Sequence, residues 1–133
     1  MTVRVATEAD RSQLARLLRQ LHPEALDPGS LPRVRQEART FVAGEPVVGL
    51  AVVTFVDYGL SAYGVLEELV VDEAARGAGV GRALVAECER WLLELDAEVV
   101  FVSAVDAGAA RFYRRSGFSD CTGPWLFRGL RVG

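Results

Sequence analysis

Three glycines at every second position lie between two arginines in the segment from 76 to 82, which reads Arg-Gly-Ala-Gly-Val-Gly-Arg. Gly77, Gly79 and Gly81 allow the backbone to approach a ligand closely and to adopt torsions that other residues resist. The sequence that follows predicts a helix, whose free first-turn amides and dipole favour an anion. Arg76 and Arg82 add fixed positive charge on either side. The segment therefore predicts an anion site suited to a pyrophosphate.

Two other phosphate motifs do not fit this segment. The dinucleotide-binding fingerprint requires a third glycine at the position of Arg82 and lies in a parallel β-α-β unit near an N-terminus. The Walker motif requires Gly-Lys followed by Ser or Thr, which the sequence does not contain. Taken alone, the segment is also compatible with a glycine-rich turn that binds no ligand.

The elements before this segment are predicted from apolar spacing. Val3 to Val5 alternates and can begin a sheet, and leucines at helical spacing predict a helix from about 9 to 21, with Thr7 and Asp10 as capping residues. A loop with three prolines and a glycine is expected to reach Pro32. A short polar helix is expected from Leu31 to Arg39.

The middle of the chain predicts an antiparallel meander and a buried helix. Thr40 to Ala43 and Pro46 to Tyr58 are expected to form a hairpin around a two-residue Gly44-Glu45 turn, followed by a strand from Ala62 to Asp72. A helix is predicted from Gly79 to Asp96, with a buried stripe of Leu84, Cys88, Trp91, Leu92 and Leu95.

The rest of the chain alternates strand and helix. Val99 to Val102 is almost purely apolar, as expected for a central strand covered on both faces. Asp106 is expected to cap a helix that Gly117 stops near Ser116, and Phe118 onward is expected to supply a last strand or two, including Trp125 to Phe127. The predicted class is α/β (α+β), with a mixed, mostly antiparallel central sheet and helices on both faces.

The pattern Arg76-x-x-Gly79-x-Gly81 after an apolar strand resembles the pyrophosphate-binding motif of the GNAT N-acetyltransferase superfamily. Val5 to Asp10 is similar to the family's opening strand and first-helix cap. Asp106 to Phe118 is similar to its last helix, in which a tyrosine precedes a glycine-aromatic pair. The resemblance covers nearly the whole length in one order, which implies a single GNAT-like domain over residues 1–133.

The resemblance implies acetyl-CoA as cofactor, bound between two strands that splay apart, 67–72 and 99–104. The pantetheine arm would pair like an added strand with the backbone of Leu69, Val70 and Val71. The diphosphate would lie on Arg76, Gly77, Ala78, Gly79, Val80, Gly81 and Arg82. The family often has Asn at the position of Asp106, so a hydrogen bond donated to the cofactor from that side chain is in question here.

The resemblance also implies direct attack of a primary amine on the thioester in a ternary complex. An alkylamine with a pKa near 10.4 is mostly protonated at pH 7 and needs a base. Glu67 matches the position of a catalytic or substrate-binding carboxylate in several family members, and Tyr113 matches the tyrosine that often protonates the CoA sulfur. Amides near Val70 would stabilise the developing oxyanion.

The assignment between Glu67 and Glu68 is open from the sequence. Neighbouring residues of a regular strand point to opposite faces, so only one of the two would face the substrate. A bulge would exchange the faces. The acceptor site is expected to include the loop around His22 to Pro32 and the sheet edge near Tyr58 to Tyr63.

Composition limits the partners. The chain is 50% hydrophobic and 25% charged, with a net charge of −3 and a pI of about 5.2, which argues against nucleic acid and mildly favours a cationic small molecule. The longest uncharged apolar stretch, from Pro46 to Val56, is too short to span a membrane. Two cysteines favour neither a disulfide scaffold nor zinc, so no metal and a cytoplasmic location are expected. An apolar C-terminus (Trp125, Leu126, Phe127, Leu130) would suit a homodimer.

Two function classes follow from these observations. The first is an acetyl-CoA-dependent N-acetyltransferase whose acceptor is unnamed, with a small amine favoured slightly over a protein amine. The alternative is a catalytically inactive CoA-binding domain that acts as a sensor or in protein interaction. Turnover with any amine would separate the two classes.

Overall fold

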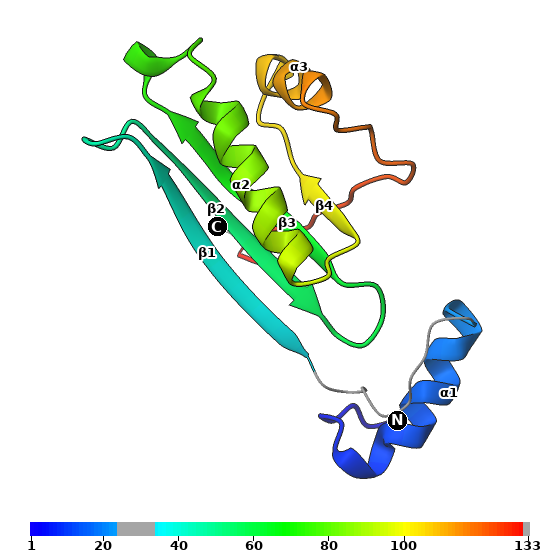
Figure 1. Cartoon of the computed structure of the whole chain (residues 1–133). Coiled ribbons are helices and arrows are strands. Elements are labelled where there is room, and N and C mark those ends of the chain that lie inside the picture. The colour runs from blue at the N-terminus through cyan, green and yellow to red at the C-terminus, as the bar shows by residue number, and fades with distance from the viewer. Residues whose placement is uncertain (24–33, 132–133) are drawn as a thin grey trace. The chain divides into compact units, whose positions relative to one another are not determined.

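The computed structural model describes residues 1–23 and 34–131 and shows an α/β fold built on one mixed sheet (Figure 1). The chain divides into two compact units, Met1–Ser103 and Ala104–Gly133. The predicted loop to Pro32 and the first part of the helix predicted from Leu31 lie outside the described residues. In the part that is described, no helix is long and apolar enough to cross a membrane.

The N-terminal segment forms a short 3-10 helix, η1 (Glu8–Asp10), followed by α1 (Arg11–Leu21), as the leucine spacing predicts. The Asp10 carboxylate accepts the Thr7 backbone N–H at 2.8 Å and both terminal nitrogens of Arg4 at 2.8 Å. These bonds from Arg4 and Thr7 hold the pKa of Asp10 well below its usual range. The strand predicted at Val3 to Val5 is wrong, because Arg4 is turned to the helix cap and Val3 and Val5 are exposed.

Three strands form the predicted antiparallel meander: β1 (Arg35–Ala43), β2 (Gly49–Asp57) and β3 (Tyr63–Val71). The helix predicted over Leu31 to Arg39 is wrong from Arg35 onward. All nine residues of β1 pair with β2, and this ladder outweighs the helix propensity of Arg, Gln, Glu and Ala. The hairpin connection is also longer than the two residues predicted, since five residues, 44–48, join β1 to β2.

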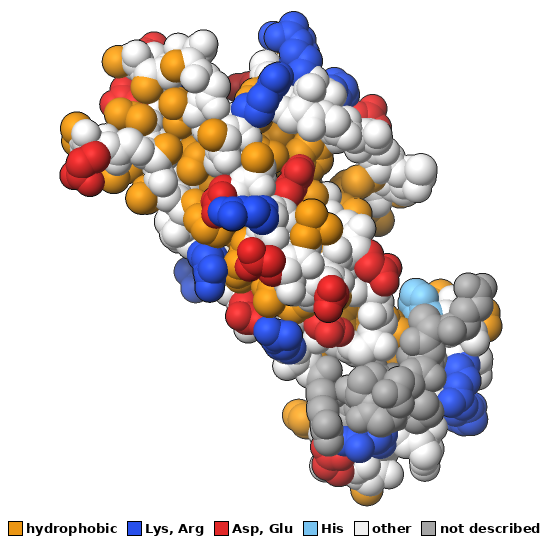
Figure 2. All heavy atoms as spheres, viewed as in Figure 1, with side chains coloured by type: hydrophobic (Ala, Val, Ile, Leu, Met, Phe, Trp, Pro, Cys, Tyr) orange, Lys and Arg blue, Asp and Glu red, His pale blue; other side chains and the backbone are white. Residues whose placement is uncertain are grey.

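Helix α2 (Val80–Glu94) covers one face of this sheet and forms the core with it (Figure 1). The predicted stripe is confirmed at Leu84, Cys88, Trp91 and Leu92, which are all buried, whereas Leu95 is half-buried. Alternate residues of β2 face the helix and are fully buried: Ala51, Val53 and Phe55. Figure 2, viewed from this side, shows acidic and basic side chains mixed over the outer surface of the helix.

The fourth strand, β4 (Val99–Val102), pairs in parallel with β3 and completes the order β1-β2-β3-β4. Its predicted position as a central strand covered on both faces is wrong in the described residues, where it is the last strand and Val99 is 43% exposed. An apolar run does not by itself fix whether a strand lies in the middle or at the edge of the sheet.

The second unit contains α3 (Ala107–Arg115), which Asp106 caps and Gly117 follows, as predicted. The last strands predicted from Phe118 onward are wrong within the described residues, because 118–131 contain no strand. Two glycines and a proline in 121–131 interrupt the chain, and a short apolar run without a paired partner does not form a ladder. The predicted α/β class with a mixed, mostly antiparallel sheet is confirmed.

Candidate functional site

The two predicted carboxylates lie at a β-bulge in β3. The pairing of β2 with β3 shifts between Val52 and Val53, because Val53 pairs with Leu66 and Val52 pairs with Glu68. Glu67 is therefore the extra residue and has no Cα partner across the ladder. Both glutamates are exposed. The β-bulge that the sequence analysis left open is thus present, and Glu67 itself is the bulged residue.

The bulge places both carboxylates on the sheet face that is turned away from α2. Residues paired across a ladder share a face, so Glu68 lies with Val52 on the face turned away from the buried Val53. Thr54 lies on that same face, and its hydroxyl donates a hydrogen bond of 2.9 Å to Glu67 Oε2. The regular strand on which only one of the two glutamates could face the substrate is therefore not present, and the bulge brings both to one face of the sheet.

From Glu67 onward, no other described strand pairs with the outer edge of β3. Pairing with β4 runs from Tyr63↔Val99 to Leu66↔Val102, and β3 then continues for five more residues. The Asp72 N–H donates to Val48 O at 2.7 Å on the β2 side. The backbone N–H and C=O groups of successive strand residues point to alternate edges of the strand. Those of Leu69 and Val71 therefore point to the outer edge, whereas the amide of Val70 faces β2.

The glycine-rich turn joins this edge to α2. Asp72 caps a short 3-10 helix, η3 (Glu73–Ala75), by accepting the Ala74 N–H at 3.1 Å. Gly77 and Gly79 then adopt φ values of +87° and +83°, a region that side-chain-bearing residues avoid. A Cβ atom at either glycine would meet no heavy atom within 4 Å. The glycines are thus needed for backbone conformation, and they leave open space over the turn.

The start of α2 presents free amides to that open space. In the first backbone hydrogen bond of α2, the Ala83 N–H donates to Gly79 O at 3.0 Å. The amides of Val80, Gly81 and Arg82 precede this ladder and lie at the positive end of the helix dipole.

The flanking arginines complete an arrangement that fits a diphosphate. Arg76 and Arg82 are exposed, and Arg76 Nε donates to Val71 O at 3.3 Å. The guanidinium is thereby tethered to the end of β3 beside the turn and keeps its terminal nitrogens as further donors. Open space, unpaired first-turn amides and fixed positive charge are what a phosphorylated ligand requires.

The remaining predicted residues lie in the second unit. Asp106 accepts the Ala109 N–H at 2.8 Å and thus caps α3, as an Asp at this position should. The ring of Tyr113 is buried, 5.2 Å from Phe112 and 5.5 Å from Phe118 in edge contacts. Two aromatic neighbours fix the plane of this ring and leave its polar end to a separate partner.

Thr54 is the residue that the sequence reasoning missed. It is the only hydroxyl residue between Gly49 and Val56, which is a visible signal in an otherwise apolar strand. Its partner became evident only from the cross-strand register.

Other potentially reactive residues do not join this site. Cys88 is buried on the inner face of α2, and burial raises the pKa of its thiol to about 11. Cys121 is exposed and accepts a hydrogen bond from Trp125 Nε1 at 3.3 Å. In the residues that the structure covers, no group of three His, Cys, Asp or Glu could hold a metal ion.

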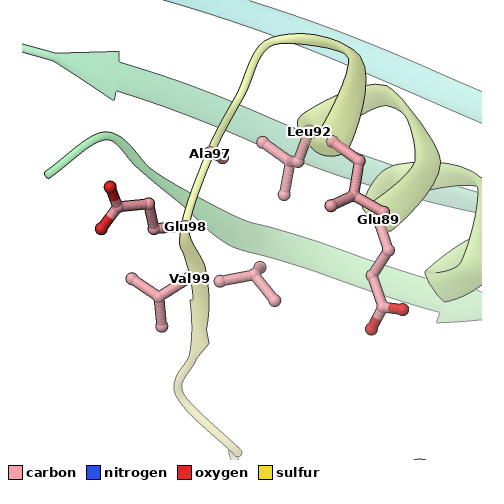
Figure 3. A pocket seen from close by; sticks show the side chains of 7 residues that line it. Glu89, Leu92, Ala97, Glu98 and Val99 are labelled. Carbon is pink, nitrogen blue, oxygen red and sulfur yellow. The ribbon is translucent and has the colours of Figure 1, made fainter.

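A pocket of about 190 Å³ opens at the other end of α2, away from the glycine turn (Figure 3). Its walls come from the last turns of α2 and from the start of β4, and none of the predicted site residues lines it. Glu98 at its edge accepts a hydrogen bond from Ser61 Oγ at 2.7 Å. This pocket is therefore separate from the predicted site.

Solved structures share this fold over almost the whole chain. A transcriptional regulator from Bacillus halodurans C-125 is 25% identical, covers 97% of this chain and 99% of its own, and has a TM-score of 0.58. The integron cassette protein HFX_CASS3 from the mobile metagenome of Cole Harbour Salt Marsh is 24% identical over 98% of this chain and 91% of its own, with a TM-score of 0.59.

An aminoglycoside acetyltransferase, meta-AAC0020 from an uncultured soil metagenomic sample, has been solved in complex with sisomicin. It is 21% identical, covers 95% of this chain and 93% of its own, and has a TM-score of 0.63. No curated protein matches the chain. The family model of the acetyltransferase (GNAT) family matches residues 8–118, which is most of the sequence. The chain therefore belongs to the GNAT acetyltransferase family.

Proposed function

We propose that this protein transfers the acetyl group of acetyl-CoA to the nitrogen of a primary amine, preferably a small diffusible amine. The observation that carries the proposal is the open turn at the start of α2, directly after residues 67–71 of β3, whose outer edge pairs with no other described strand. A family of acetyltransferases places this chain's chemistry in the class of acyl transfer. The bulge with its two carboxylates stands at the beginning of the same edge.

The cofactor would be held by backbone and by two arginines. The outward N–H and C=O of Leu69 and the outward N–H of Val71 would pair with the pantetheine amides, in the manner of an added strand, while Val71 O accepts from Arg76 Nε. The amides from Gly77 to Arg82 and the guanidinium of Arg76 take the diphosphate. Acetyl-CoA, when bound, supplies the acetyl thioester that the amine attacks.

The chain's own side chains would manage the protons. Glu67 accepts a proton from the ammonium form of the acceptor, directly or through water, because only the neutral amine is nucleophilic. The family resemblance assigns protonation of the departing sulfur to the hydroxyl of Tyr113. Glu68, on the same face as Glu67, attracts and orients a cationic acceptor.

Several observations support an amine as acceptor. Two carboxylates on one sheet face favour a cation over an anion, and the net charge of −3 acts in the same direction. The complex of the structurally similar aminoglycoside acetyltransferase with sisomicin shows that a related fold accommodates an amine-bearing ligand. The preference for a small amine over a protein amine rests on the charge pattern.

The proposal is tested by following thiol release from acetyl-CoA with a panel of polyamines, amino acids and aminoglycosides. Turnover should be found with at least one amine. Removing the base should lower kcat/KM by about 10²-fold or more in Glu67→Gln, in the usual range of general-base effects. Glu94→Gln, at the exposed end of α2, is the charge-matched control and should leave the rate unchanged.

The same assay decides between the two function classes. If the protein binds acetyl-CoA tightly but releases no thiol with any amine, it is the inactive CoA-binding domain. If Glu67→Gln is as active as the natural protein while turnover is clear, the transferase stands and Glu67 is not its base.

A further inference from the structure

We infer that Thr54 is a positioning residue that aims the Glu67 carboxylate at the acceptor amine. This inference rests on the proposed function, since it assigns a second residue to the same site. The observation behind it is the 2.9 Å hydrogen bond from Thr54 Oγ1 to Glu67 Oε2. No other side chain among the described residues is shown bonded to Glu67.

The bulge makes such a support necessary. Glu67 is the unpaired extra residue of β3, so the ladder does not fix the direction of its side chain as it does for Glu68. Glu67 is also exposed, and an exposed glutamate samples many rotamers. A base that samples many directions is correctly placed for proton transfer only part of the time.

Thr54 is suited to the task by its position and its chemistry. It lies in the middle of β2 on the same sheet face, directly opposite Val65, and is half-buried between ordered strands. A β-branched side chain on a strand has few χ1 rotamers, so its hydroxyl is held in place. The hydroxyl can donate to the carboxylate, and it engages one of the two oxygens, Oε2.

The geometry leaves Oε1 of Glu67 as the oxygen that takes the proton of the ammonium group. Anchoring one oxygen orients the other and restricts the carboxylate to one side of the bulge. Thr54 itself exchanges no proton with the acceptor. Its effect should therefore be visible only while Glu67 is present, which distinguishes positioning from a general contribution to stability.

The test uses the pair Thr54→Val and Thr54→Ser in the full chain. Valine keeps the shape and removes the donor, so kcat/KM for the best amine should fall about 3- to 10-fold, the effect of one hydrogen bond to a charged group at a partly exposed site. Serine keeps the donor and should stay within about twofold. Acetyl-CoA affinity measured by calorimetry should change in neither variant.

Two controls separate positioning from disturbance of the sheet. Thr40→Val makes the same substitution on the same face one strand away, opposite Val52, and should leave kcat/KM unchanged. In the Glu67→Gln background, Thr54→Val should cause no further loss. An independent fall in that double variant, or a loss in Thr54→Ser equal to that in Thr54→Val, would overturn the inference.

A spectroscopic readout tests the inference even if no acceptor is found. With ¹³C labelling, the side-chain carboxyl resonance of Glu67, assigned through Glu67→Gln, should move in Thr54→Val and stay in place in Thr54→Ser and Thr40→Val. An unmoved resonance in Thr54→Val would refute the hydrogen bond in solution. Absence of turnover with every amine would instead refute the proposed function and leave this readout to decide the role of Thr54.

Discussion

Replacing Gly79 should reveal how much the anion turn depends on its unusual backbone. Gly79 is the N-cap of α2 with φ +83° and ψ 10°. An L-residue in this left-handed region loses roughly 1–2 kcal/mol relative to its ordinary conformation. A Cβ atom there would meet nothing within 4 Å, so no steric clash adds to this figure. Gly79→Ala should therefore lower the free energy of unfolding by about 1–2 kcal/mol.

The order of substitutions at Gly79 makes the reasoning specific. Asparagine adopts the left-handed region more readily than alanine, so Gly79→Asn should lower the free energy of unfolding by less than Gly79→Ala does. A β-branched residue tolerates positive φ least, so Gly79→Val should lose most. Gly123→Ala is the matched control, because Gly123 also has open space around it and is not among the glycines with positive φ.

Urea denaturation followed by the fluorescence of the buried Trp91 measures these differences. Acetyl-CoA titrations on the same samples should show weaker binding in the order of the stability losses, because relief of the strain moves the amides of the turn. Equal stability of Gly79→Ala and Gly123→Ala, within about 0.3 kcal/mol, would refute the argument from backbone conformation.

Four further tests address the packing, the thiols and the second unit. A Cβ atom at Gly64 would lie 2.5 Å from both Cδ atoms of Leu92, so Gly64→Ala should lower the free energy of unfolding by about 1–3 kcal/mol. The double variant with Leu92→Ala should lose less stability than the sum of the losses in the two single variants. Ellman's reagent at pH 8 should label Cys121 quickly and Cys88 only in urea, since the Cys88 thiol is buried with a pKa of about 11; two fast thiols would contradict this. Because the unfolded Cys88 thiol ionises near its ordinary pKa of 9.0, the free energy of unfolding should also fall, by up to about 3 kcal/mol, as pH rises from 9 to 11. A fall that persists in Cys88→Ala would assign it to other groups. Asp106→Ala removes the acceptor of the Ala109 N–H and should lower helix stability by about 1 kcal/mol, measured by circular dichroism in urea, whereas Asp106→Asn should keep most of it.

The parts of the fold that were predictable are those with strong local signals. Helix α2 follows from its apolar stripe, the β1–β2 hairpin from two apolar runs around Gly44, and α3 from a capping Asp106 and a terminating Gly117. These signals lie within one element or one turn and need no knowledge of the rest of the chain.

Several failures occur where a partner outside the predicted element decides the outcome. Residues 35–39 have helix-forming composition but become a strand because β2 offers a nine-residue partner. Val3 to Val5 has strand alternation, yet Arg4 pairs with Asp10 instead. Local propensity is a weak prior against such tertiary interactions.

The candidate site shows the same division. The glycine turn and its arginines were predictable, because conformation and charge there are properties of neighbouring residues. The orientation of Glu67 was not, because it depends on a one-residue shift in the register of β2 against β3. Thr54, 13 residues before Glu67, enters the site only through that shift.

Calorimetric titration with acetyl-CoA tests the central claim most directly, with ATP as a competing phosphate ligand. The natural protein should bind acetyl-CoA with micromolar affinity, and Arg76→Ala should bind it at least about tenfold more weakly, the loss of one charge-assisted contact. Arg90→Ala, which removes an exposed arginine paired with Glu87 on α2, should bind as the natural protein does. Failure of the folded natural protein to bind acetyl-CoA, or equal binding by all three proteins, would contradict the assignment of the cofactor to the turn at the start of α2.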